Sequence, residues 1–312
     1  MENLIISLNV VLPLFLMMAL GYLLKCLHLF PGNSLNTINN LCFKVFLPIL
    51  LYYNIYQTRL EGVFDLKLAL FAAGCVVAGF FLALFIVPRL EKDNRKRGVL
   101  VQGIFRSNFI LFGLPITISL VGKEQSGVTA LMIAIVIPLF NMLAVTALEL
   151  FRGEKVRVKA ILKGIIANPL IWGCVLGILT LLLRVRFPSA VETALSDLAG
   201  IATPLALVVL GGFFHFKSIK GYGRQLILGL GGKLVLIPAL FLPLSILLGF
   251  RGAPLVSLLS MFASPVAVSS FIMAQNMDGD ADLAAQLVVL GSACSIVTLF
   301  VWVLLIKSMG FV

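Results

Sequence analysis

Ten stretches of mostly apolar residues, most of them long enough for a membrane helix, follow one another along this chain. A helix needs about 20 such residues to cross the hydrocarbon core of a bilayer. The composition agrees with this interpretation, because 61% of the 312 residues are hydrophobic and only 12% are charged. The expected spans are residues 4–24, 41–56, 66–87, 99–121, 127–148, 161–183, 195–214, 225–248, 253–275 and 285–306. The sequence therefore predicts an all-α integral membrane protein with ten transmembrane helices, embedded in the lipid bilayer.

The charged residues gather in short loops between these stretches. Fourteen lysines and arginines fall in the odd-numbered loops, and seven fall in the even-numbered loops and chain ends. Short basic loops remain in the cytoplasm, so we expect both termini on the extracytoplasmic side of the cell (inner) membrane. Loop topology also explains the net charge of +11, and we expect no nucleic-acid partner.

Two pairs of prolines recur at similar distances along the chain. Pro48 and Pro204 are 156 residues apart, and Pro115 and Pro265 are 150 residues apart. Five spans per half is an odd number, so the second half must enter the membrane in the opposite sense from the first. We expect a single transmembrane transporter domain at 1–312, with a first five-helix repeat at 1–150 and an inverted second repeat at 151–312.

Pro115 and Pro265 lie inside the fourth and ninth expected spans. Proline breaks helical hydrogen bonding, and secondary transporters place such breaks near the bilayer midplane. Proline also suits the first position of a helix, so each would start a half-helix whose amino end faces the centre. Two facing amino ends carry about one positive charge together, which suits one carboxylate. The alternative is that both prolines only kink packed helices.

Asn108 is the polar residue placed best for a substrate contact. It precedes Pro115 by nearly two helical turns and so shares its face, and a neutral amide donates to a carboxylate at a smaller burial cost than a charge. Hydrogen bonding between helices is the alternative. In the second half, Ser264, Gln275 and Asn276 are weaker candidates, for which a structural role is favoured.

Apart from Lys67 and Lys163 at span ends, three basic residues fall inside the expected spans, whereas central acidic residues are essentially missing from them. Arg106 lies about seven residues into the fourth span, where it either attracts anions, including a second carboxylate, or extends back to the basic loop. We expect Lys44 to reach the membrane surface, and Lys233 is balanced between a scaffold role and a functional one. Cation antiporters and proton pumps usually need a buried carboxylate, so the composition favours anionic substrates.

No metal ligands, cofactor motif or catalytic group stand out. The five cysteines are isolated, without the spacing of a metal or redox pair. The acidic run at residues 278–282 lacks the later glutamate of a calcium loop, and we expect it to cap the last helix. An intramembrane enzyme acting on lipid-linked substrates is a weaker alternative, because no Ser-His pairing is placed for catalysis. We therefore expect no cofactor, no metal and no enzyme activity.

Several motifs resemble those of the auxin efflux carrier family in its short prokaryotic form, which includes permeases for malate and malonate. The most specific is Arg106-Ser107-Asn108 followed by Gly113-Leu114-Pro115. The others are residues 45–48 (VFLP) and 203–206 (TPLA), Ser264-Pro265, Phe271, Ala274, Asp280, Ala284-Ala285 and Val288.

This resemblance implies two inverted five-helix repeats with broken, crossing helices four and nine, an architecture related to bile-acid sodium symporters. It also implies an elevator-type movement, with organic anions held near the crossover by Asn108, Pro115 and Pro265. The substrates implied are mono- or dicarboxylates such as malate or malonate, or more widely auxin-like acids. Auxin itself is not expected, because the long central loop of plant carriers is missing.

Together these features predict a secondary transporter that moves small organic anions across the cell membrane by alternating access. The candidate substrate-binding residues are Arg106, Asn108, Gly113, Pro115, Ser264 and Pro265. A membrane sensor or a channel with the same fold remains the alternative. Coupling to a proton, to sodium or to no ion stays open, and a homodimer is the assembly considered.

Overall fold

The computed structural model describes residues 2–58, 65–153, 158–215 and 221–311, and these fold into helices without any strand. Seven helical stretches among them are long and apolar enough to cross a membrane. Three shorter apolar helices, Val11–Cys26, Pro169–Leu182 and Gly252–Ala263, lie at the positions of the first, sixth and ninth expected spans. The all-α prediction is confirmed, and the apolar helices agree with an integral membrane protein. Of the loop cations counted above, Arg59, Lys155, Arg157, Lys217 and Lys220 lie outside the described residues.

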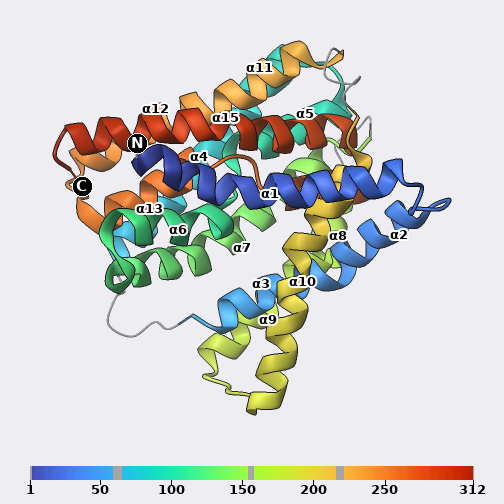
Figure 1. Ribbon diagram of the computed structural model, residues 1–312, viewed down its shortest axis with the longest axis horizontal. Coiled ribbons are helices and arrows are strands. Elements are labelled where there is room, and N and C mark those ends of the chain that lie inside the picture. Colours follow the sequence, from blue (N-terminus) through green and yellow to red (C-terminus); the bar gives the residue numbers. More distant parts are fainter. Residues whose placement is uncertain (1, 59–64, 154–157, 216–220, 312) are drawn as a thin grey trace.

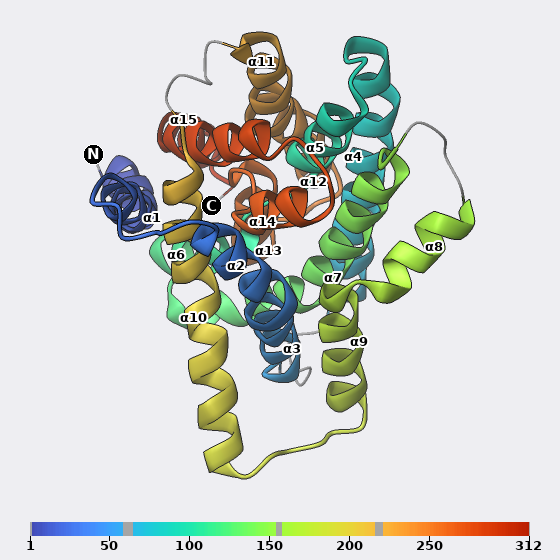
Figure 2. The same ribbon diagram turned by 90° about the vertical axis from the view of Figure 1, so that its right-hand side faces the viewer.

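One group of helices forms what we call the first bundle, in which α9 and α10 extend away from the rest of the molecule (Figures 1 and 2). In it, α1 packs against α10, and α3 packs against both α9 and α10. Its members are α1 (Glu2–Cys26), α3 (Leu47–Tyr56), α9 (Pro169–Leu182) and α10 (Ser189–Phe213). The helices α2 (Ser34–Leu41) and α8 (Val158–Ala167) lead into α3 and α9.

The second bundle contains the remaining helices. In it, α4 packs on α5 and α7, α6 packs on α13, and α14 packs on α15. Its members are α4 (Leu66–Leu90), α5 (Asn94–Phe105), α6 (Phe109–Val121), α7 (Gly127–Leu150), α11 (Gly223–Gly231), α12 (Ile237–Leu247), α13 (Gly252–Ala263), α14 (Ser269–Asn276) and α15 (Ala281–Ser308). The two bundles meet mainly where α1 contacts α15 and α6.

Small residues bring the helices of the first bundle into backbone contact. A Cβ atom added at Gly211 on α10 would lie 1.9 Å from the backbone oxygen of Met18 on α1. A Cβ atom at Gly173 on α9 would likewise lie 2.5 Å from the backbone oxygen of Pro48 on α3. Such close crossings are a main source of helix association in lipid, where packing replaces the hydrophobic effect. The helices of the first bundle are therefore packed closely against one another.

Two spans contain a π-helical turn close before a proline. These turns are Cys42–Phe46, followed by Pro48, and Gly232–Leu236, followed by Pro238. Proline cannot donate to the carbonyl four residues earlier, and a π turn shifts the hydrogen-bond register there. In the second case the carbonyl of Leu234 accepts from Nε1 of Trp302 at 3.0 Å. This turn also carries Lys233, which is completely buried.

The fourth and ninth spans are each broken in the middle, and the two breaks touch. The first break, at residues 106–108, separates α5 from α6, and the second, at residues 264–268, separates α13 from α14. The backbone N–H of Asn108 donates to the backbone oxygen of Pro265 at 2.8 Å. Pro265 therefore lies in a break, as the sequence predicts, but it does not start the following half-helix, because α14 begins at Ser269.

The prediction that Pro115 starts a half-helix is wrong, because Pro115 lies inside α6. A proline in a helix removes one hydrogen bond, here the one that the carbonyl of Leu111 would accept. A membrane helix tolerates this loss where the freed group faces protein or a cavity. Both Leu111 and Pro115 line a cavity between the bundles, so the helix continues through the proline.

Candidate functional site

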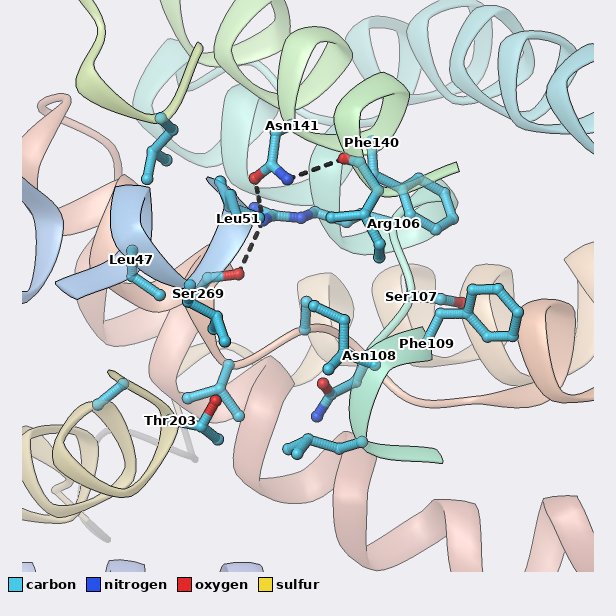
Figure 3. A pocket seen from close by; sticks show the side chains of 18 residues that line it. Leu47, Leu51, Arg106, Ser107, Asn108, Phe109, Phe140, Asn141, Thr203 and Ser269 are labelled. Carbon is cyan, nitrogen blue, oxygen red and sulfur yellow. Dashed lines mark hydrogen bonds between the residues drawn. The ribbon is translucent and has the colours of Figure 1, made fainter. Parts of the chain in front are cut away.

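A cavity of about 50 Å³ lies where the two breaks meet. The first bundle contributes apolar residues of α3, including Leu47 and Leu51, together with Thr203 of α10. The second bundle contributes most of the polar groups, and Figure 3 shows how they lie. These polar residues are Arg106, Ser107, Asn108, Asn141 and Ser269. The site therefore lies between the bundles and includes both broken spans.

Arg106 directly follows α5 and is only 3% exposed. One terminal nitrogen, Nη2, donates to Oδ1 of Asn141 and to Oγ of Ser269, each at 2.7 Å, and Nη1 lies 2.7 Å from Sδ of Met273. The Asn141 amide is itself oriented by donating to the Ile137 backbone oxygen at 2.8 Å. All of these acceptors are neutral, and no carboxylate in the described part of the chain pairs with Arg106. Buried arginines normally have an anionic partner, so this side chain is suited to an anion from outside the protein.

Asn108 stands at the amino end of α6 and is 6% exposed. An asparagine at this position usually caps the helix by accepting from its first amides, but the side chain of Asn108 makes no capping bond. Its Nδ2 atom is buried and has no hydrogen-bond partner among the described atoms. Nδ2 and the first amides of α6 together form a group of donors beside the cavity.

The amino ends of two helices face this cavity. The first turn of α6 contributes Phe109 and Ile110, and the start of α14 contributes Val268 and Ser269. Amino ends of helices carry partial positive charge and free N–H groups, so they attract anions. Two amino ends thus face the cavity, although α6 begins after Asn108 and not at Pro115, and α14 begins after Val268 and not at Pro265.

Lys233 joins the two broken spans on the side away from the cavity. Ser107 points away from Arg106 and Asn108 (Figure 3), and its hydroxyl donates to the Met261 backbone oxygen. Nζ of Lys233 donates to Oγ of Ser107 and, at 3.2 Å, to the backbone oxygen of Phe262. The sequence left the role of Lys233 undecided, and in the structure its side chain forms hydrogen bonds with both broken spans.

Two other candidates lie next to the site without lining it. A Cβ atom at Gly113 would lie 2.8 Å from the Phe109 ring and 3.1 Å from Cγ2 of Thr129, so this glycine allows close packing of α6. Ser264 is buried, and its hydroxyl donates to the Ser260 backbone oxygen. Both therefore shape the breaks from outside the cavity.

The weaker candidates in the second half have structural partners. Gln275 donates to Oδ1 of Asn36 at 3.2 Å, and Asn276 donates to the Ile272 backbone oxygen in its own helix at 2.8 Å. Sequence reasoning missed Asn141 as a site residue. Its only signal is that it is an isolated amide in the apolar fifth span.

The acidic run at 278–282 has the capping role that the sequence predicts. Asp280 accepts from the backbone N–H of Leu283 at 2.9 Å, at the start of α15, and from the Tyr222 hydroxyl at 3.0 Å. Burial and the neighbouring Asp280 raise the pKa of Tyr222, which keeps this hydroxyl a donor. No cluster of His, Cys, Asp or Glu suited to a metal ion occurs among the residues described.

Proteins similar to this chain are named as transporters. An "Uncharacterized transporter" of Methanothermobacter thermautotrophicus is 25% identical over 308 residues, which is 95% of this chain and 97% of that protein. An uncharacterized transporter of Escherichia coli (strain K12) is 25% identical over 294 residues, which is 88% of this chain and 91% of that protein. A protein of Rhizobium meliloti (strain 1021) named "Putative malonate transporter" is 23% identical over 308 residues, 96% of each chain. The family described as "Membrane transport protein" matches residues 6–303, which is nearly the whole length of this chain. The chain therefore belongs to this family, which is that of the auxin efflux carriers.

Proposed function

We propose that this protein is a secondary transporter of small organic anions and holds the carboxylate of its substrate at the crossing of the two breaks. The observation that carries the proposal is Arg106, a buried cation whose partners among the described residues are neutral, in one cavity with Nδ2 of Asn108, which has no partner in the same part of the chain. Mono- and dicarboxylates such as malate or malonate are the substrate class. The name of the Rhizobium meliloti relative, which refers to malonate, supports this class.

A carboxylate in the cavity would complete interactions that the protein leaves open. It would be the anionic partner of Arg106, and it would accept hydrogen bonds from Nδ2 of Asn108 and from the first backbone amides of α6. Hydrogen bonds in which the donor or the acceptor is ionised are about twice as strong as those between neutral groups, and the low dielectric constant of the interior strengthens them further. The same groups would repel a cation, so the site favours anions.

The proposal includes ten spans arranged as two inverted five-helix repeats. The bundles support it, because the first bundle contains spans one, two, six and seven, and the second contains the remaining six. Each half of the chain thus contributes two spans to the first bundle and three to the second, as two equal repeats would. The broken fourth and ninth spans also occupy matching positions in the two halves.

We further propose that alternating access is an elevator-type movement. The tightly packed first bundle would be the scaffold, and the second bundle, with both breaks, would slide past it. A carboxylate held by Arg106 and Asn108 would travel with the second bundle. In this proposal both termini face the extracytoplasmic side of the cell membrane. The proposal allows transport coupled to a proton, to sodium or to no ion.

Flux through purified protein in liposomes tests the proposed function. We expect saturable uptake of labelled malate or malonate that is accelerated by unlabelled carboxylate on the opposite side. Imposing pH, sodium and voltage gradients separately identifies the coupling ion. Uptake that does not saturate would indicate a channel, and binding without flux would indicate a sensor. If a panel of carboxylates neither binds nor moves, the proposal fails.

A further inference from the structure

We infer that the preferred substrate has one carboxylate and an apolar body, and that this body occupies a second cavity beside the breaks. This inference rests on the proposed function and narrows its substrate class. The second cavity has a volume of about 540 Å³, within the range of about 300–1,000 Å³ that is typical of small-molecule sites. It lies between α1, α3, α6 and α10, where the two bundles meet.

The two cavities adjoin each other. Leu50, Ile110, Leu111 and Thr203 line both of them. Figure 3 shows the amide of Asn108 and the side chain of Thr203 on one side of the smaller cavity, with the Arg106 guanidinium on the other. A substrate bound to Arg106 and Asn108 can therefore extend past Thr203 into the larger cavity.

The size of the polar cavity limits what it holds. Its volume is about 50 Å³, roughly a tenth of the volume of the second cavity. This space suits a single carboxylate group. The remainder of any larger acid must lie in the second cavity.

The lining of the second cavity favours apolar groups. Apart from Ser119 and Thr203, its described side chains are apolar, and they include Pro115, Pro204 and Leu207. Among the described residues that line either cavity, Arg106 alone is charged. A second carboxylate would lie in this apolar part without a cation, and burial of an unpaired charge is strongly unfavourable. Each added methylene, in contrast, should tighten binding about fourfold.

Competition by unlabelled acids against a labelled carboxylate in proteoliposomes tests the inference. We expect affinity to rise about fourfold per methylene from acetate to hexanoate. Malonate and succinate should bind at least about tenfold more weakly than propionate and butyrate, since the second charge finds no partner. A flat series, or tighter binding of the dicarboxylates, would overturn the inference and leave the proposed function standing. If neither acetate nor malonate nor any longer acid competes, the proposed function itself is wrong.

A pair of glycine variants separates cavity binding from partition of long acids into lipid. Gly200 on α10 lines the second cavity, and a Cβ atom there would meet no other atom within 4 Å. Gly200→Leu therefore adds bulk to the cavity without a backbone clash. Gly74 on α4 is equally unobstructed and lines neither cavity, so Gly74→Leu is the matched control.

The measured quantity is the ratio of hexanoate affinity to acetate affinity in each protein. We expect Gly200→Leu to lower this ratio at least about tenfold, because the added side chain takes the space of the longer chain. Gly74→Leu should keep the wild-type ratio. An unchanged ratio in Gly200→Leu would mean that a lipid chain or nothing occupies the cavity, and a decrease of equal size in both variants would assign the effect to lipid partition. Either result overturns the inference.

Discussion

Replacing Asn108 with alanine should change substrate binding and protein stability in opposite directions. The backbone bonds of this residue, from its N–H to Pro265 and from the Phe112 N–H to its carbonyl, do not involve the side chain. Only the amide is removed, and its Nδ2 atom has no partner within the described protein. Burial of an unsatisfied polar group costs about 1–3 kcal/mol. The substrate-free variant should therefore be as stable as the wild type or more stable by up to about this amount.

Carboxylate binding should weaken in the same variant. A hydrogen bond to a charged group contributes about 1.5–3 kcal/mol, which corresponds to a loss of affinity of about 10- to 150-fold. Thermal unfolding of purified Asn108→Ala with and without carboxylate measures both effects in one assay. The melting temperature without substrate should be kept or raised, and the stabilisation by substrate should largely disappear.

Asn276→Ala is the matched control for this experiment. Asn276 bonds within its own helix and does not line the cavity. Its replacement should leave affinity unchanged and lower stability slightly. If Asn108→Ala instead lowers stability and binds carboxylate as tightly as the wild type, then Asn108 is a structural residue and the reasoning fails.

Three further predictions follow from the charged groups. Arg106→Gln removes the cation of the site and should weaken carboxylate binding about 30- to 5,000-fold, the equivalent of about 2–5 kcal/mol for a buried charge pair; near-normal competition by carboxylates would exclude Arg106 from the site. Lys233→Met removes the amine that joins the two broken spans and should lower maximal flux while changing KM less than about tenfold, because Lys233 does not line the cavity. A rise of KM like that of Arg106→Gln would contradict this position. Burial raises the pKa of Glu91, but hydrogen bonds from two backbone amides and from Gln225 outweigh burial and hold this pKa below its usual value. Glu91 therefore stabilises the fold above about pH 4.3, the usual pKa of a glutamate. This stabilisation is lost as the pH falls through the lower pKa of Glu91 in the folded protein. Melting temperatures across this range should fall less steeply for Glu91→Gln, and parallel curves would show that Glu91 contributes nothing.

Lipid burial is why so much of the fold could be predicted from the sequence. Apolar runs of span length are visible in composition alone, and the structure has an apolar helix at each of the ten expected positions. The break near Pro265 was also predictable, because proline removes a backbone donor. These features depend on local chemistry.

The first break depends on contacts between distant residues. Residues 106–108 contain neither proline nor glycine, and the chain leaves the helix where Asn108 bonds to Pro265 and where Arg106 reaches Asn141 and Ser269. Pro115 was misleading because one lost hydrogen bond is tolerated beside a cavity. The candidate residues Arg106 and Asn108 are found on the cavity wall, but Asn141 becomes visible as a partner only when the spans are packed.

A bromine-labelled substrate gives the most direct measurement of the central claim. Anomalous diffraction from crystals grown with 6-bromohexanoate locates the bromine independently of the protein atoms. We predict a carboxylate within hydrogen-bond distance of Arg106 and Asn108, and a bromine peak in the larger cavity beside Pro115 and Gly200. A bound bromohexanoate whose carboxylate lies away from the two breaks would contradict the assignment of this site.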